Sequence, residues 1–252
     1  MKPHCHVYDL GKVEYGPVFE LQKQAVRAMR EGKLSNTILL LEHPPVFTIG
    51  RAGGAEHVLV TAKEREQIGI SMFDVDRGGD VTYHGPGQLV GYPILHLESW
   101  KNDVRLYVRM LEEVVIRLLA DFGIQAGRKE GLTGTWVGEE KICAIGVKAN
   151  RDTAHKGFIT SHGFAFNIHP DLRHFGYIVP CGITEYGVTS LHQLLGSAPD
   201  MQEMKLRWVM AFQEVFGASV EWPTDDIRER IASGQGEAAS ENNAFRTDRM
   251  YE

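Results

Sequence analysis

The sequence predicts a single α+β domain built on a mixed sheet, followed by a charged tail. Short strand-like apolar runs and well-separated amphipathic helical segments share the chain, which is the pattern of this fold class. The 252 residues are 43% apolar and 24% charged, enough to bury one large core. No linker divides residues 1–223, whereas residues 224–252 are rich in charged and small side chains. We therefore expect one folded domain over residues 1–223 and a flexible tail over 224–252.

The first part of the chain predicts strands around one long helix. Val18, Leu21, Ala25 and Met29 recur at helical spacing, and Thr61 with Glu64 has the spacing of a capping box. The expected elements are strands over residues 5–10, 38–42, 46–50 and 71–75, helices over 15–33 and 62–68, and a glycine turn over 51–54.

The second part contains the most regular helix of the chain. Over residues 103–122, Tyr107, Leu111, Val114 and Leu118 share one stripe, and Asp103 is placed to cap the helix. The other expected elements are strands over 135–137, 142–147 and 164–168, short helical turns over 171–177 and 190–195, and a helix over 201–216. Within the tail, one amphipathic turn is expected near Ile227 and Ile231.

Residues 77–93 form an unusual stretch, RGGDVTYHGPGQLVGYP. Its five glycines allow positive φ and let the backbone approach a ligand closely, and the apolar LVGYPILHL follows at once. This combination predicts a binding loop on a buried strand. The alternative is an elaborate hairpin turn in which His84 is a capping residue.

The cysteines predict a thiol site and no disulfide framework. The three cysteines form no CxxC pair; Cys181 lies between Pro180 and Gly182 in a loop-like segment, whereas Cys143 lies in the apolar run ICAIGV. A nucleophilic thiol needs a cationic or basic neighbour. The candidates are Lys141, Lys148, His84 and His162. Alternation along the strand places Lys141 on the same protected face as Cys143 and Ile145, although a lysine is most often a solvated charge.

Several classes of function are disfavoured. The net charge of −6 gives no indication of nucleic-acid binding. No apolar run approaches the eighteen or so residues of a membrane span, and the N-terminus has no apolar signal core, so we expect a cytosolic protein with no membrane contact. The segment His4-Cys5-His6 is not expected to bind a metal, because neighbouring strand residues point to opposite faces and no second ligand pair follows.

Four segments in this order resemble one enzyme family. RGGDVTYHGPGQLVGYP, EEKICAIGVKA, SHGFAFNI and IVPCGI are similar to the octanoyltransferases, also called lipoyl(octanoyl) transferases or lipoate biosynthesis protein B, over about residues 5–220. The ATP-dependent lipoate ligases share the fold but have a different glycine-rich loop and no cysteine in the matching place. The resemblance implies the catalytic fold of the biotin and lipoate protein ligases.

The resemblance also implies a reaction and its participants. Cys181 would take the octanoyl group from octanoyl-acyl carrier protein as a thioester, and Lys141 would lower the pKa of Cys181 and act as general acid and base. The acceptors would be lysine ε-amines of the lipoyl domains of 2-oxoacid dehydrogenase complexes and of the glycine cleavage H protein. This is the first step of endogenous protein lipoylation, and it needs no nucleotide cofactor because the thioester is already activated.

Substrate-contacting residues follow from the same resemblance. They are Arg77, Gly78, Gly79, Asp80, Val81, Thr82, Tyr83 and His84, then Ala144, Ile145 and Gly146, then Gly163, Phe164 and Ala165. Val90, Ile145 and Phe164 are expected as apolar walls of the acyl slot. His84 is expected to be a structural or orienting group.

Three alternatives remain open at this point. One is an ATP-dependent lipoate or biotin-type ligase on the same fold, another is a carrier-binding module without catalysis, and the third is a cysteine hydrolase that pairs Cys181 with His84 or His162. Because both protein substrates are expected to be acidic, a local basic rim is also expected. Its candidate residues are Arg128, Lys129, Lys148, Arg151 and Lys156.

Overall fold

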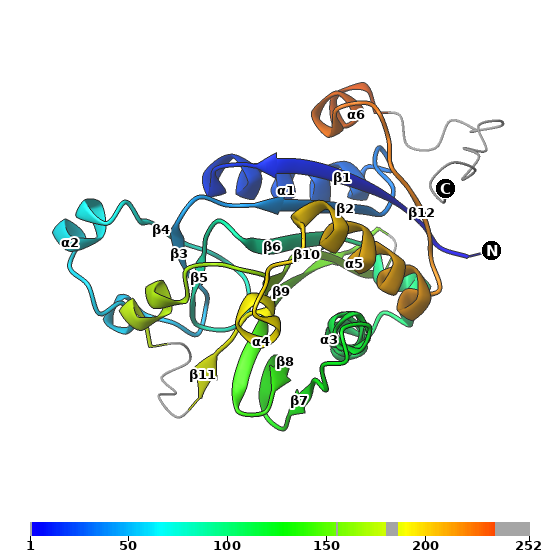
Figure 1. Ribbon diagram of the computed structural model, residues 1–252. Helices are drawn as coiled ribbons and strands as arrows, with labels where there is room; N and C mark the ends of the chain where they lie inside the picture. The colour runs from blue at the N-terminus through cyan, green and yellow to red at the C-terminus, as the bar shows by residue number, and fades with distance from the viewer. Residues whose placement is uncertain (1, 155, 180–185, 235–252) are drawn as a thin grey trace.

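The computed structural model describes residues 2–154, 156–179 and 186–234. These residues form a large mixed sheet, a small second sheet and helices on both faces (Figure 1). The large sheet has the order β12 (Ser219–Glu221), β1 (His4–Lys12), β2 (Thr37–Glu42), β6 (Gln88–Ile94), β10 (Gly157–Asn167), β9 (Glu140–Asp152), β8 (Leu132–Val137) and β7 (Gly127–Lys129), with β11 (Gly187–Val188) paired to β9. β1 runs parallel to β2 and β12. Each neighbouring pair in the order β2, β6, β10, β9, β8, β7 is antiparallel.

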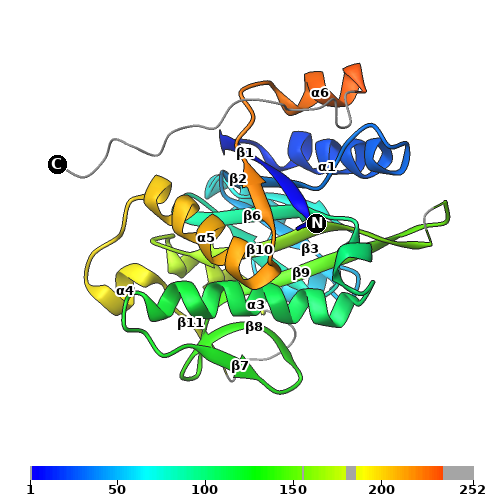
Figure 2. The same cartoon turned by 90° about the vertical axis from the view of Figure 1, so that its right-hand side faces the viewer.

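Helices cover both faces of the large sheet (Figures 1 and 2). On one face lie α3 (Val104–Ala120) and α5 (Met201–Phe216), whose apolar stripes enclose a core containing Tyr107, Leu111, Trp208 and Phe212. On the other face lie α1 (Tyr15–Arg30) and α6 (Ile227–Ser233). Each helix buries the stripe that its 3.6-residue periodicity predicts, so the sheet is protected on both sides.

The helix starts follow the capping chemistry expected from the sequence. The Asp103 carboxylate accepts hydrogen bonds from the backbone N–H groups of Arg105 and Leu106 at the start of α3. The predicted capping box of Thr61 and Glu64 opens the short helix α2 (Ala62–Gln67). The expected short turns appear as a 3-10 helix (Leu172–Tyr177) and α4 (Leu191–Leu195). None of the helices in the described ranges is both long and apolar enough to cross a membrane.

The glycine-rich stretch of residues 77–93 is divided between the two sheets. Its first part enters β5 (Val81–His84), which pairs with β3 (Val46–Ile49) beside β4 (Ser71–Asp74) in the small sheet. Its second part is β6 in the large sheet, where every residue is buried. The buried strand was predicted, but the small sheet was not, because the pairing of β5 with β3 joins residues far apart in the sequence.

Strands β9 and β10 are longer than the apolar runs that predicted them. They pair antiparallel from Cys143 and Phe166 out to Asp152 and Gly157. Polar residues at the outer end of this pair show no apolar alternation, so the sequence underestimates its length. This hairpin provides the floor of the site described below.

The chain continues to contact the domain beyond residue 223. Asp226 caps α6 through the backbone N–H of Arg228, and Ile227 is buried in the core beneath α1, with Ile231 packed beside it. The turn expected near Ile227 and Ile231 is therefore a helix that packs on the sheet layer. The division of the chain at residue 223 stays a prediction, and residues 235–252 lie outside the described part.

Candidate active site

A cavity of about 500 Å³ lies between the β9–β10 pair and the glycine-rich segment that precedes β5. Thirteen of the fourteen substrate-contacting residues expected from the sequence line it, and so does Lys141. Those thirteen are Arg77, Gly78, Gly79, Asp80, Val81, Thr82, His84, Ala144, Ile145, Gly146, Gly163, Phe164 and Ala165. Three segments that are distant in the sequence are thus brought to one cavity.

Backbone hydrogen bonds fix the glycine-rich segment above the hairpin. The N–H of Gly78 donates to the carbonyl oxygen of Val147 on β9 at 2.9 Å, and the carbonyl of Gly79 accepts from Ala52 at 3.1 Å. Gly79 has φ +82°, a left-handed conformation that a side chain disfavours. The 51–54 turn therefore supports the site through its backbone, and it does not line the cavity.

The Arg77 side chain joins the segment to the small sheet. Its guanidinium Nη2 donates to the carbonyl oxygen and the hydroxyl of Thr48 at 2.7 and 2.9 Å, and Nη1 donates to the carbonyl of Gly78 at 3.1 Å. The side chain is 8% exposed. A buried guanidinium needs hydrogen-bond acceptors. The bonds to Thr48 and Gly78 therefore fix the Arg77 side chain beside the cavity.

Asp80 holds a histidine that the sequence did not indicate. The Asp80 carboxylate Oδ2 lies 2.6 Å from Nδ1 of His57, and its Oδ1 accepts from the backbone N–H of Val81 at 2.6 Å. This hydrogen bond raises the pKa of His57. The carbonyl of His57 accepts from the N–H of Val179 at 2.9 Å, so the pair lies beside the segment that leads to Cys181.

His84 is a buried neutral group. Its Nδ1 lies 2.8 Å from the side-chain oxygen of Gln88. Burial, followed by the effect of His43, lowers the pKa of His84 to about 3. A neutral imidazole already engaged by Gln88 is suited to orienting its neighbours, in agreement with the structural role expected for it.

Tyr83 and Val90 were expected at the site, but neither lines the cavity. Alternation along β5 directs Tyr83 into the core of the small sheet against Phe47, where its hydroxyl lies 2.8 Å from Nδ1 of His174. Val90 is buried in the core beneath α1. Ile145 and Phe164 do line the cavity.

Aromatic side chains that the sequence did not single out close the deep end of the cavity. Tyr15 begins α1 and Tyr92 belongs to β6, and both line the cavity while remaining almost fully buried. The Tyr92 hydroxyl lies 2.8 Å from Nε2 of His43. Burial lowers the pKa of His43 to about 4, so this histidine is neutral near neutral pH. The Arg77 guanidinium also lines this cavity and interacts electrostatically with Tyr15 and Tyr92.

Lys141 lies near the start of β9, at the end of the cavity lining that is opposite the aromatic cluster. Its Nζ is 4.7 Å from the centre of the Trp136 ring. Of the two residues expected on its face, Ile145 lines the cavity with Lys141, whereas Cys143 does not. The register shifts between β8 and β9, so that Thr135 pairs with Cys143 and Trp136 pairs with Lys141. This irregularity adds one residue to β9 and breaks the simple alternation.

Cys181 lies outside the described residues, but both flanking segments are placed. Phe175 and Val188, six and seven positions away, line the same cavity as Lys141. Val188 pairs with Lys141 in β11, and the N–H of Thr189 donates to the Lys141 carbonyl at 3.1 Å. Cys143 was expected to be a buried structural thiol; it is fully buried, and burial raises its pKa.

The expected basic rim is largely neutralised. Arg128 pairs with Glu112 and Glu113, Lys129 pairs with Glu139, and Lys148 pairs with Asp76. Of the five, Arg128, Arg151 and Lys156 are exposed, whereas Lys129 and Lys148 are partly buried. These pairs compensate charge inside the protein, so the five residues do not form one continuous positive surface.

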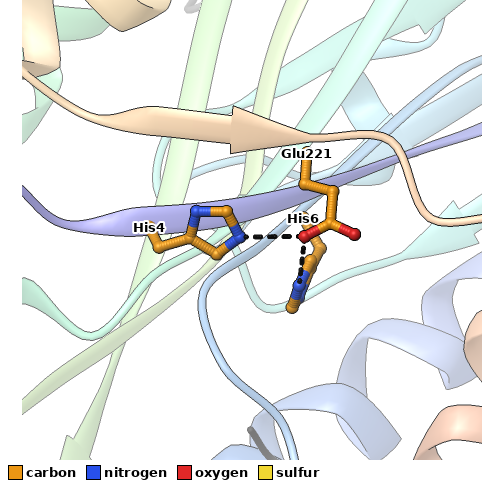
Figure 3. A group of neighbouring side chains, drawn as sticks. All are labelled: His4, His6 and Glu221. Carbon is orange, nitrogen blue, oxygen red and sulfur yellow. Dashed lines mark ion pairs between the residues drawn. The ribbon is translucent and has the colours of Figure 1, made fainter. Parts of the chain in front are cut away.

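A second group of polar side chains lies at the edge formed by β1 and β12 (Figure 3). Nε2 of His4 and Nε2 of His6 lie 3.4 and 3.8 Å from one carboxylate oxygen of Glu221. The parallel register of β12, which the sequence does not reveal, brings Glu221 to the two histidines. However, Nη1 of Arg230 lies 3.2 Å from Nε2 of His6, and Asp225 holds that guanidinium. Because a divalent ion would repel this charge, we assign the group a role in joining β1, β12 and α6.

Comparison with known proteins agrees with this geometry. Residues 14–213 match the family described as the lipoyl protein ligase A/B catalytic domain. An octanoyltransferase from Solibacter usitatus (strain Ellin6076) is 48% identical over 213 residues, which are 84% of this chain and 93% of that protein. An octanoyltransferase from Thermoanaerobacter sp. (strain X514) is 48% identical over 212 residues, 84% of this chain and 90% of that protein.

The fold is also shared with a solved structure of lower sequence similarity. Lipoate-protein ligase A bound with ATP superposes with a TM-score of 0.70 at 17% identity, covering 93% of this chain and 92% of the other. This likeness confirms the predicted mixed-sheet ligase fold, and the 48% identical relatives confirm the resemblance found in the motifs. The chain belongs to the lipoyl protein ligase A/B catalytic domain family.

Proposed function

We propose that this protein transfers an octanoyl group from octanoyl-acyl carrier protein to a lysine ε-amine of lipoyl domains. One observation carries the proposal: Lys141 shares a single cavity with the glycine-rich segment and with the apolar side chains of Ile145 and Phe164. An amine beside an apolar slot suits a substrate that has a hydrophobic chain and a reactive carbonyl. The names of the 48% identical relatives support the same activity.

The apolar part of the cavity accounts for recognition of the acyl chain. Each methylene group removed from water contributes about 0.8 kcal/mol, so an eight-carbon chain supplies several kcal/mol to binding. Ile145 and Phe164 are buried core residues whose surfaces also face the cavity. The chain would therefore be held by a preformed wall, with little ordering of the protein on binding.

In the first half-reaction, the sulfur of Cys181 attacks the thioester carbonyl carbon, and the carrier thiol leaves. Lys141 takes the proton of the Cys181 thiol and returns it to the departing carrier sulfur. The product is an octanoyl thioester on Cys181. The pairing of Val188 with Lys141, and the lining positions of Phe175 and Val188, support this meeting of Cys181 with the cavity.

In the second half-reaction, the ε-amine of the acceptor lysine attacks the Cys181 thioester. An amide forms, the cysteine sulfur leaves, and the proton lost by the amine returns to the cysteine through Lys141. The N–H of Gly78 is already bonded to Val147, so it is not free to donate to the tetrahedral oxyanion. Other backbone N–H groups of the lining must provide that stabilisation.

The acceptors proposed are the lipoyl domains of 2-oxoacid dehydrogenase complexes and the glycine cleavage H protein. Either presents a lysine on a folded domain, which must deliver its amine to the Lys141 end of the cavity. The hydrolase alternative requires a histidine base. His84 is a weak base, because its pKa is about 3 and its Nδ1 is bonded to Gln88. His162 is held by Asp76 through Nε2, but it pairs with Val147, six residues along β9 from Lys141.

Intact-mass analysis after mixing with octanoyl-acyl carrier protein tests the proposal. We expect one octanoyl adduct, mapped to Cys181, that is lost on adding a lipoyl domain and is absent from Cys181→Ser. Cys143→Ser serves as the matched thiol control and should still form the adduct. An adduct on Cys143, or full transfer by Cys181→Ser, would exclude the proposed nucleophile.

The ATP-dependent ligase activity is separated by a second assay. Free octanoate, ATP and the protein should release no pyrophosphate, whereas octanoyl-acyl carrier protein should support transfer without ATP. Pyrophosphate release coupled to acylation of a lipoyl domain would instead establish the ligase reaction.

A further inference from the structure

A second cavity begins where the acyl cavity ends. Its volume is about 260 Å³, and it lies between α1 and the outer part of the β9–β10 pair. Its lining consists of Phe19, Gln22, Lys23, Val26, Arg27, Arg30, Asp76, Lys148, Asn150, Ser161 and His162. Within the described chain, His162 is the single residue that lines both cavities. Its ring therefore separates the two spaces.

The His162 ring, which forms the partition between the two cavities, is held by hydrogen bonds and by contacts with neighbouring rings. Nε2 of His162 lies 2.8 Å from the Asp76 carboxylate, which is also paired with Lys148. The backbone N–H of His162 donates to the side-chain oxygen of Gln22 at 2.7 Å. The ring lies between Phe19 on the side of the second cavity and Tyr92 on the side of the acyl cavity, with centroid distances of 5.5 and 6.4 Å. His162 is 2% exposed.

The two sides of the partition differ in chemistry. The acyl cavity has the apolar walls Ile145 and Phe164, and three of its 26 lining residues, Arg77, Asp80 and Lys141, are charged. In the second cavity, four of the eleven lining residues are Lys or Arg and one is Asp. An alkyl chain that passed His162 would displace water from charged groups. Burial of further methylenes would then no longer be favourable.

We propose that His162 sets the upper limit on acyl-chain length. This inference rests on the proposed function, because it places the thioester at the Lys141 end of the cavity. From Lys141, the lining residues of β9 continue through Ala144 and Gly146 to Val147, which pairs with His162. The methyl end of the chain then points toward the partition. A chain that is too long must move a ring fixed by Asp76, Gln22 and the neighbouring aromatic rings.

The test uses His162→Gly in the full chain. Glycine removes the ring and tolerates the φ of +56° found at His162. Lys101→Gly is the matched control, because Lys101 is exposed and has φ +63°. Equimolar octanoyl-, decanoyl- and dodecanoyl-acyl carrier protein compete for each protein, and intact mass gives the adduct ratios. We expect the dodecanoyl-to-octanoyl ratio to rise roughly tenfold or more in His162→Gly, and not in Lys101→Gly.

An unchanged ratio in a folded His162→Gly that forms adducts would overturn the inference. Absence of adducts from every donor in the wild-type protein would instead contradict the proposed transfer reaction. Binding of free fatty acids tests the partition without catalysis. In the wild-type protein, affinity should rise about fourfold per methylene and then stop rising at one chain length. Continued growth through fourteen carbons would overturn the inference, even if His162→Gly failed to fold.

Discussion

Val147 and His162 face each other across the β9–β10 pair at the point where the apolar cavity gives way to the cationic one. The carbonyl of Val147 also accepts from the N–H of Gly78, so the glycine-rich segment is fastened at the same point. This one pair of neighbouring residues therefore fixes both the end of the cavity and the position of the glycine-rich segment. Lys141 lies six residues along β9, at the other end of the lining.

Replacement of Lys141 should remove catalysis without removing the fold. We expect Lys141→Ala to slow formation of the octanoyl adduct by 10²- to 10⁴-fold, the usual contribution of a positioned acid–base group. Single-turnover intact-mass kinetics measure this rate. Lys63→Ala, on the exposed face of α2, is the control and should react at the wild-type rate. Equal rates for Lys141→Ala and wild type would remove Lys141 from the mechanism.

The three thiols should differ sharply in reactivity. Burial raises the pKa of Cys5 to about 12 and holds the pKa of Cys143 above its ordinary value, so both remain protonated and inaccessible. Brief alkylation of the native protein at pH 8, followed by peptide mass spectrometry, should label Cys181 alone. Denaturation before alkylation should label all three. Rapid native labelling of Cys143 would show that its strand opens or that another thiol reacts.

Gly79→Ala should disturb both stability and activity. The φ of +82° at Gly79 costs a residue with a side chain about 1–2 kcal/mol, which should appear as a lower free energy of unfolding in urea. Because the backbone of Gly79 is fastened to Ala52, adduct formation should also slow. Gly127→Ala is the control, since a Cβ there meets nothing within 4 Å and φ is not positive. A loss of similar size in both variants would refute the conformational explanation.

The buried histidines should make the protein less stable as the pH falls. In the folded state the pKa values of His43 and His84 are about 4 and about 3, below the unfolded value of about 6.5. Their contribution is present above pH 6.5, and it is lost as the pH falls toward the folded pKa values, because the unfolded chain binds more protons. Between pH 7 and 5 each should lower the free energy of unfolding by about 2 kcal/mol.

Urea titrations at pH 7, 6 and 5 measure this effect. His84→Gln should reduce the pH dependence, whereas His192→Gln, on the exposed surface of α4, should leave it unchanged. His57 contributes with the opposite sign, because its pKa is raised and its stabilisation is present below pH 6.5. Stability that rose from pH 7 to pH 5 would contradict the buried neutral state of His43 and His84.

Local sequence patterns determined the helices and their faces. The stripes of α1, α3 and α5 follow a 3.6-residue period, and the caps at Asp103 and Thr61 depend on residues only a few positions away. The glycine-rich signature of residues 77–93 also indicated a ligand-facing segment and the family, because its residue types serve one backbone geometry and need no distant partner to be recognised.

Long-range strand pairing decided the rest. The shift of register opposite Trp136 turned Lys141 toward the cavity without Cys143, and the pairing of β5 with β3 turned Tyr83 away from it. The role of His162 also appears only when α1, β6 and β10 meet around its ring. A change of one residue in register reverses the face of a strand side chain, and that register depends on residues far apart in the chain. The sequence therefore determined which groups the protein carries, and the tertiary structure decided which of them share a cavity.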